Sequence, residues 1–344
     1  MLKKKIHREN SALPIHLLTS VCILFLILYS GCDPQPPSMR KKEKLEFDPD
    51  FVLPGSAVPA PIVNPRHGSV QEVGGTLKNI ELVIGVEING ETRAYPLNML
   101  SGPDKQLIND ELGNEKILVS FCPTCFNVQV HPRVINGKEL EFFVSGFLWE
   151  GNMVIKDTET ESFWSVIRAE AMKGEYKGTQ LDHFPILITT WGKWTELHPN
   201  TTVFLADRTE SNFTTRFFRN SDKFVCGLKN GDGTIHFSYV DLNQSRVINA
   251  TVDSKPIVLF LDRLLGSVSC FERSSQEQEF SFDFQNEKVI DQFGNTWNLD
   301  IGVQLDEQGN PTGDALQRVA TMPSYKKAWD IFRPESQLWK SDSQ

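Results

Sequence analysis

The sequence lacks several motifs that would point directly to a known chemistry. It contains no phosphate-binding loop, dinucleotide fingerprint, His-Glu-x-x-His, calcium loop or Gly-x-Ser-x-Gly nucleophile elbow. It also lacks a surplus of positive charge, because 35 Lys and Arg stand against 44 Asp and Glu, a net charge of −9. Nothing therefore indicates a nucleotide-dependent enzyme, a zinc protease or a serine hydrolase, and nucleic acid is not expected as a partner.

Long apolar runs are missing as well. The segment from Leu17 to Tyr29 is apolar, but it is short and is interrupted by Thr19 and Ser20. A membrane-spanning helix needs a longer stretch. The segment follows a basic start with Lys3, Lys4, Lys5 and Arg8, and this combination is typical of an export signal. An uncleaved membrane anchor is the alternative.

The apolar segment ends in Leu28-Tyr29-Ser30-Gly31-Cys32, which resembles the lipobox of bacterial lipoproteins. The resemblance implies that residues 1–31 are removed as a signal peptide and that Cys32 is lipidated. Cleavage removes four basic residues and Glu9, a net +3, so the formal charge of −9 becomes −12. We therefore predict an exported lipoprotein of the cell envelope, periplasmic or cell-surface, attached to a membrane through Cys32. Residues 32–75 would form the lipidated Cys and a Pro-rich tether.

Cysteine is scarce, with six residues in the chain, but two of them form Cys122-Pro123-Thr124-Cys125. Apolar and polar residues alternate on both sides of this motif, which predicts two half-buried strands joined by a turn. A thioredoxin-type helix after the motif is disfavoured by the same alternation. Acidification of a thiol would then depend on nearby cations, with Lys116, Arg133 and a protonated His131 as candidates.

Three interpretations of the Cys122–Cys125 pair remain open. The first is a redox-active or exchangeable dithiol, which an export signal permits. The second is a metal site for zinc or Cu(I), although no second Cys-x-x-Cys supplies the other ligands. The third is an inert disulfide or two buried thiols. The metal site would have to be completed from Cys226, Cys270, His131, His183, His198 or His236.

The globular part is predicted to be mainly β, an α+β fold with few short helices. Short apolar runs are separated by hairpin signals such as Asn89-Gly90, Asn136-Gly137 and Asp232-Gly233. Two helices are expected: one over 191–197, capped by Thr189-Thr190, and one over 325–332, capped by Ser324.

Two stretches of the globular part resemble each other in order and spacing. Residues 117–133 align with 257–273, and Trp194-Thr-Glu-Leu-His-Pro199 aligns with Trp329-Asp-Ile-Phe-Arg-Pro334. We therefore predict two tandem copies of one β-rich unit that form two lobes, with a first repeat at 76–207, a linker at 208–221 and a second, degenerate repeat at 222–340.

The second repeat lacks the cysteine pair, because Asp262 and Leu265 align with Cys122 and Cys125. If the pair were needed only to fold the unit, the second copy would be expected to keep it. The comparison therefore favours a functional role in the first repeat. Cys226 and Cys270 align with the apolar Ile84 and Val130, which indicates core packing. Asp157 and Trp164 recur as Asp291 and Trp297, so they are expected to serve the fold.

Motifs along the globular part together resemble the bacterial family catalogued as domain of unknown function 3179. They are, in order, Gly85-Val86, Arg93-Ala94-Tyr95-Pro96-Leu97, Asn109-Asp110, Cys122-Pro123-Thr124-Cys125, Ser145-Gly146, Asp157, Thr160, Ser162 with Trp164, Gly174, Gly178 and Trp191-x-x-Trp194-x-x-x-His198-Pro199. The family's activity is not established. Some members carry selenocysteine within the Cys-Pro-x-Cys motif, which implies a reacting chalcogen there. This chain departs from the family pattern at Thr124-Cys125-Phe126 and at Val166, and Phe126 is expected to narrow access to the pair.

The leading hypothesis is thus an extracytoplasmic thiol protein, possessing thiol-disulfide oxidoreductase-like chemistry, whose partner is a protein disulfide, a peroxide or a small thiol. Cys122 would attack and Cys125 would resolve, with His131, Arg133 and His198 in support. No cofactor is predicted. A second hypothesis is a non-enzymatic lipoprotein that binds copper or zinc through the Cys pair. A third is a purely structural cell-envelope protein.

Overall fold

The computed structural model describes residues 46–48, 53–54, 58–275 and 278–341. The predicted signal peptide, Cys32 and the start of the tether lie outside these residues. Part of the expected tether belongs to the fold, because β1 (Leu53–Pro54), β2 (Ile62–Val63), β3 (His67–Ser69) and α1 (Val70–Val73) fall within it. In the part of the chain that the structure describes, no helix combines the length and apolarity needed to cross a membrane.

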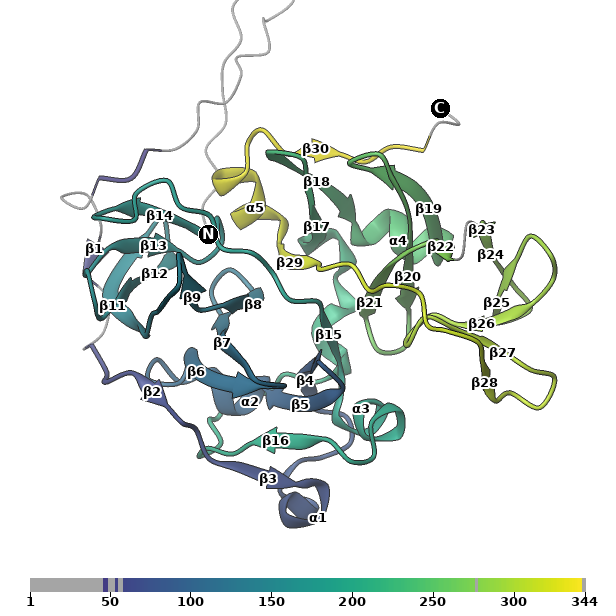
Figure 1. The fold of residues 1–344 in the computed structure, drawn as a ribbon, viewed down its shortest axis with the longest axis horizontal. Helices are drawn as coiled ribbons and strands as arrows, with labels where there is room; N and C mark the ends of the chain where they lie inside the picture. Colours follow the sequence, from purple (N-terminus) through teal and green to yellow (C-terminus); the bar gives the residue numbers. More distant parts are fainter. Residues whose placement is uncertain (1–45, 49–52, 55–57, 276–277, 342–344) are drawn as a thin grey trace, which may run out of the picture. The chain divides into compact units, whose positions relative to one another are not determined.

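The protein is mainly β, as predicted, and its helices are few and short (Figure 1). The first half builds three larger sheets and one two-stranded ribbon. Their strand orders are β15-β4-β5-β16-β3, β2-β6-β7-β8, β1-β11-β12-β13-β14 and β10-β9. The new strands are β4 (Leu82–Ile88), β5 (Glu91–Pro96), β6 (Leu107–Leu112), β7 (Glu115–Cys122), β8 (Asn127–Pro132), β9 (Val134–Ile135), β10 (Lys138–Glu139), β11 (Phe142–Trp149), β12 (Asn152–Asp157), β13 (Phe163–Ser165), β14 (Glu170–Lys173), β15 (Ile186–Thr190) and β16 (Thr202–Phe204).

The second half repeats this plan with the orders β29-β17-β18-β30, β19-β20-β21, β22-β23 and β24-β25-β26-β27-β28. Its strands are β17 (Phe224–Asn230), β18 (Gly233–Ser238), β19 (Val247–Val252), β20 (Lys255–Asp262), β21 (Ser267–Glu272), β22 (Ser274–Ser275), β23 (Gln278–Glu279), β24 (Phe282–Gln285), β25 (Lys288–Asp291), β26 (Thr296–Asn298), β27 (Val303–Leu305), β28 (Pro311–Thr312), β29 (Met322–Tyr325) and β30 (Gln337–Leu338). One parallel pairing corresponds as well, since β16 joins β5 as β30 joins β18.

Individual contacts recur in both halves. The indole N–H of Trp164 donates to Asp157 (2.9 Å), and that of Trp297 donates to Asp291 (3.0 Å), so these residues serve the fold as predicted. Gly85 lies against the Trp194 ring, as Gly227 lies against Trp329; an added Cβ would come within 2.2 Å and 2.0 Å of the respective rings. These glycines are required because the rings occupy the space of a side chain.

The remaining helical segments are η2 (Gly74–Thr76), α2 (Leu97–Leu100), α3 (Trp191–Leu197), η3 (Thr215–Arg219), η4 (Ser221–Lys223), α4 (Tyr239–Ser245) and α5 (Lys326–Phe332). Thr190 caps α3 by accepting from the Lys193 N–H, as expected. The expected Ser324 cap of α5 is wrong. Tyr325 holds the cap position without a side-chain bond, because the Ser324 hydroxyl donates to Cys125 instead.

The largest apolar core includes residues of both halves. β29 contacts β8, and β15 contacts β21, so the two halves touch each other through corresponding strands. The contacts group the described residues into one compact unit. The boundaries of the two repeats, and their division into two lobes, stay predictions.

Candidate functional site

The Cys122–Cys125 motif is a turn between two strands, as predicted. β7 ends at Cys122, and β8 begins at Asn127, its cross-strand neighbour. The expectation of half-buried strands is wrong, however. From Ile117 to His131, the strand residues are buried on both faces. One face contributes to the main core; on the other, Leu118 and Cys122 of β7 join a second apolar cluster, and β8 has the buried polar side chains of Asn127, Gln129 and His131. The turn is therefore held at the end of a fully enclosed hairpin.

Phe126 closes this turn in a left-handed backbone conformation, with φ of 46°. The corresponding residue of the second half is Gly266, with φ of 68°. A bulky residue in this region is uncommon, and such conformations often occur at functional sites. The Phe126 ring is completely buried and packs against Phe217 at 4.5 Å between ring centroids. The ring therefore supports the turn from the core side. The expectation that Phe126 narrows access to the cysteine pair is wrong, because the ring does not line the cavity.

Residues from the far end of the chain hold the turn from another side. The Tyr325 N–H donates to the Cys125 carbonyl oxygen at 2.9 Å, and the Ser324 hydroxyl donates to the same oxygen at 3.2 Å. Thr124 donates its hydroxyl to the Gly151 carbonyl at 2.9 Å. Hydrogen bonds from both halves of the protein thus fix the turn that carries the two cysteines.

The two sulfurs are free thiols with different acidities. The Cys122 sulfur lies 3.2 Å from the Thr124 hydroxyl, and the Cys125 thiol lies 3.8 Å from the Cys122 carbonyl. A hydrogen bond from Cys125, helped by Thr124 and the Met153 backbone, lowers the pKa of Cys122 from 9.0 to about 6 against the effect of burial. Burial and the neighbouring Cys122 raise the pKa of Cys125 well above 9.0. Cys122 is therefore the thiolate of the pair, and Cys125 carries the proton.

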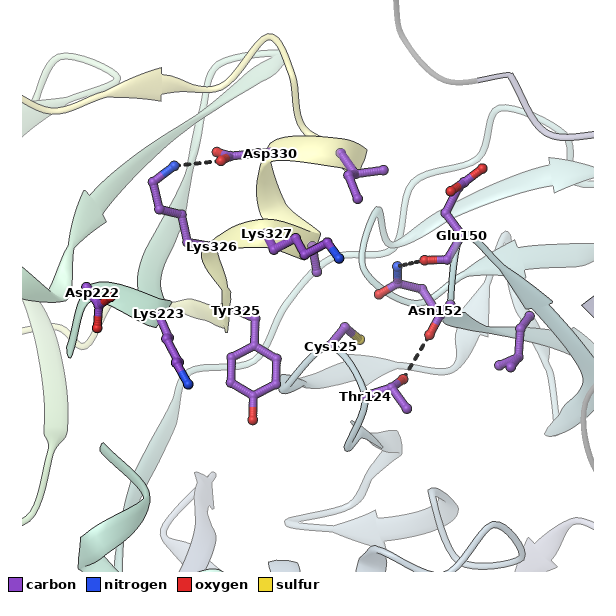
Figure 2. A pocket seen from close by; sticks show the side chains of 14 residues that line it. Thr124, Cys125, Glu150, Asn152, Asp222, Lys223, Tyr325, Lys326, Lys327 and Asp330 are labelled. Atoms are coloured by element: carbon purple, nitrogen blue, oxygen red, sulfur yellow. Dashed lines mark hydrogen bonds and ion pairs between the residues drawn. The ribbon is translucent and has the colours of Figure 1, made fainter. Parts of the chain in front are cut away.

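A cavity of about 920 Å³ reaches the pair from outside (Figure 2). Cys125 belongs to its lining, whereas Cys122 does not. Both cysteines are nearly enclosed, with exposed fractions of 1% for Cys122 and 2% for Cys125. The cavity is also lined by Thr124, Leu148, Glu150, Gly151, Asn152, Asp222, Lys223, Tyr325, Lys326, Lys327, Ala328, Asp330 and Ile331.

His131, one of the expected supporting residues, lies four strand positions beyond Asn127 and contacts a different set of groups. Its ring packs against His183 at 4.8 Å, and its Nδ1 lies 2.7 Å from the Asp182 carbonyl oxygen. Burial lowers the pKa of His131 to about 4. It is therefore neutral near pH 7 and does not supply the cation that we expected to acidify a thiol.

The two other supporting residues also lie away from the cavity. Arg133 forms an ion pair with Glu139 (2.6 Å), and Arg273 forms the same pair with Glu279 (2.5 Å), so this arginine serves the fold of both halves. The His198 ring packs against that of Trp194, tilted by 41° with 4.1 Å between ring centroids, and His198 lines a separate cavity of about 280 Å³. Lys116 pairs with Glu111. The acidity of Cys122 thus comes from hydrogen bonds and not from these cations.

Sequence reasoning missed the residues that approach the turn from the second half. Tyr325 ends β29, Lys326 and Lys327 begin α5, and Lys223 ends η4. Nothing in their local sequence indicates that they lie near Cys125. The one available signal was the predicted tandem repeat, because two copies of one unit can pack against each other and bring residues of the second copy to the first.

Sequence reasoning also missed two amides on β8. The side chains of Asn127 and Gln129 are buried, and in the part of the chain that the structure describes neither has a hydrogen-bond partner. Asn127 lies directly opposite Cys122 in the sheet register. The second half has Ser267 and Ser269 at the aligned positions. The fold therefore does not demand these amides, which accompany the cysteine pair.

Other metal-ligand candidates are dispersed. Cys226 and Cys270 lie in the main core, as expected, and His236 contacts Ser336 at 2.9 Å. Over the described ranges, no three His, Cys, Asp or Glu residues come together as a metal would require.

The fold and the site define a β-rich protein of two similar halves, with an unequal thiol pair at the wall of a cavity. The chain matches the family described as "Protein of unknown function (DUF3179)" over residues 56–336 and belongs to that family, as its motifs predicted. Comparison with curated proteins found no match, and comparison with solved structures found none either.

Proposed function

We propose that the protein is an exported, lipid-anchored thiol–disulfide protein in which Cys122 and Cys125 alternate between dithiol and disulfide. One observation carries the proposal: an acidified thiolate and a protonated thiol are held together in a fixed turn that borders a cavity. An inert buried pair would be expected to have raised pKa values at both sulfurs, as at Cys226 and Cys270. The absence of the pair from the second half adds support.

Acidity and access are divided between the two sulfurs, and this division assigns their roles. Cys125 borders the cavity, so an incoming disulfide meets this sulfur first. The Cys122 thiolate takes the Cys125 proton, and Cys125 then attacks one sulfur of the incoming disulfide and releases the other as a thiolate, which takes a proton from water. Cys122 attacks the resulting mixed disulfide, its proton passing to the second released thiol. The pair loses two electrons and its one proton, and the incoming disulfide gains these together with one proton from water.

The reverse reaction uses the same asymmetry. An external thiolate attacks Cys125 of the disulfide, and Cys122 leaves as the stabilised thiolate, because a thiol of lower pKa leaves faster. The mixed disulfide therefore forms at Cys125. Sequence order alone had suggested Cys122 for this role, with Cys125 as the resolving residue.

The location in the cell envelope rests on the sequence. Its support is the basic start, the apolar segment and the lipobox-like residues before Cys32. Extracytoplasmic compartments also suit a protein that forms a disulfide reversibly.

Intact mass spectrometry across a thiol–disulfide redox titration tests the proposal. We expect the mature chain to begin at Cys32 with added acyl groups. We also expect a reversible loss of two hydrogens that disappears in both Cys122→Ser and Cys125→Ser. An unmodified amino terminus would contradict the lipid anchor, and a pair that never changes mass would contradict the redox function.

A further inference from the structure

The cavity beside Cys125 restricts what can react there. Only 2% of Cys125 is exposed, so the disulfide of a folded protein could not reach its sulfur from the protein surface. The volume of about 920 Å³ is in the range of small-molecule sites. The reacting molecule must therefore enter the cavity, which favours a low-molecular-mass disulfide or thiol.

The base and the rim of the cavity differ in character. Cys125, Asn152 and Ala328 are buried, and Leu148 and Ile331 add apolar surface around them. The charged lining residues are the more exposed ones. Apart from the Asn152 amide, this base is apolar and suits the carbon atoms next to a sulfur, so the charged groups of a bound molecule would lie toward the rim.

The rim offers charges of both signs. Lys326 and Asp330 form an ion pair with each other at 2.6 Å on α5. Within the described residues, Lys223, Lys327, Glu150 and Asp222 have no ion-pair partner; these four residues are named the free rim charges. Figure 2 shows Lys223 and Lys327 extending from different segments toward the space beside Tyr325 and Cys125, with Glu150 across the cavity. Two cations and two carboxylates are thus available to a ligand.

Resting on the function proposed above, we infer that the substrate is a small zwitterionic thiol or disulfide of the amino-acid or short-peptide class. Its sulfur would meet Cys125, its carboxylates would contact Lys223 and Lys327, and its ammonium groups would contact Glu150 and Asp222. This arrangement matches each free rim charge with an opposite charge. A purely anionic thiol would leave the two acids unmatched, and a neutral one would use none of the four.

Stopped-flow oxidation of the reduced full-length protein tests the inference. The disulfides are cystine and glutathione disulfide as zwitterions, hydroxyethyl disulfide as a neutral small molecule, and insulin as a protein disulfide. At low salt, we expect the zwitterionic disulfides to react about tenfold faster than hydroxyethyl disulfide, after correction for their intrinsic reactivity with a free thiol, and insulin to react slowest.

Variants identify the cavity as the source of this preference. Lys327→Met and Glu150→Gln should each reduce the preference for zwitterions several-fold. Lys138→Met, an exposed lysine on β10, is the matched control and should leave it unchanged. Equal rates for charged and neutral small disulfides, or faster oxidation by insulin, would overturn the inference while leaving the redox function standing. Failure of every disulfide to oxidise the pair would overturn both.

Discussion

The backbone N–H of Tyr325 donates to the carbonyl oxygen of Cys125 at 2.9 Å, which joins β29, an edge strand of the β29-β17-β18-β30 sheet in the second half, to the thiol turn of the first. Ser324 adds its hydroxyl to the same oxygen. The second half, which lacks the cysteine pair, therefore supports the site directly. It also supplies Tyr325, Lys326 and Lys327 to the cavity.

Ser324→Ala should destabilise the protein by about 1 kcal/mol, because it removes one buried hydrogen bond to Cys125 and leaves the oxygen with a single donor. Urea unfolding measures this free energy. Thr189→Val is the matched control. Thr189 in β15 is the residue of the first half that aligns with Ser324, and its buried hydroxyl has no hydrogen-bond partner among the described residues. Removal of the Thr189 hydroxyl should therefore not destabilise, and equal losses in both variants would contradict the role of Ser324.

Gly85→Ala and Gly227→Ala should each destabilise the protein by about 1–3 kcal/mol, since the added methyl group overlaps the ring of Trp194 or Trp329. Thermal or urea unfolding provides the measurement. Gly233→Ala is the control, because its nearest contact to an added Cβ is 3.6 Å away. If Gly85 tolerated alanine as well as Gly233 does, the shared glycine–tryptophan packing would not be a requirement of the two halves.

Reduced protein should gain stability as the pH rises from about 6 toward 9. The folded pKa of Cys122, about 6, lies below its ordinary 9.0, so in this window the unfolded chain binds more protons at this residue and unfolding is disfavoured. The gain is complete above pH 9 and is lost as the pH falls through about 6. Cys125 has the opposite effect on stability, because its folded pKa is raised above 9.0. Its contribution therefore lowers the stability only as the pH rises above 9.

Urea unfolding between pH 6 and 9 measures this effect, and the ultraviolet absorbance of the thiolate reports the titration itself. Cys122→Ser is the control and should show neither the gain nor a titration near pH 6. A wild-type thiolate that titrates at 9 or above would contradict the acidity assigned to Cys122.

His131→Phe should reduce the loss of stability in acid. Buried His131 is neutral, with a pKa of about 4 against an ordinary 6.5, so the unfolded state binds the additional proton between these values. Stability is therefore lost as the pH falls from 6.5 to about 4. Phenylalanine is the residue of the second half at this position, Phe271. The slope of unfolding free energy against pH should fall by up to one proton, and His183 retains its own contribution. An unchanged slope would show that His131 is not buried neutral.

The sequence predicted those features that depend on neighbours in the chain. Alternation around Cys122 and Cys125 located the hairpin turn, and the Thr190 cap located α3. The aligned tryptophans and aspartates identified contacts that recur in both halves. The same comparison singled out the cysteine pair as a property of the first half only.

The sequence did not predict contacts between distant segments. Alternation could not reveal that both faces of β7 and β8 are covered, since the covering sheets come from elsewhere. Ser324 fits a helix cap by local rules, yet tertiary structure assigns its hydroxyl to Cys125. His131 and Arg133 lie close to the cysteines in sequence, but strand geometry and ion pairing direct them to other partners.

The reduction potential of the Cys122–Cys125 pair tests the central claim most directly. It is measured on the mature protein by equilibration with thiol–disulfide buffers, followed by alkylation and mass spectrometry. The stabilised Cys122 thiolate favours the reduced form, so we expect a potential above about −300 mV, in the range of exchanging disulfides. A potential below that value, or a pair that stays in one state in every buffer, would contradict a redox function and leave a structural one.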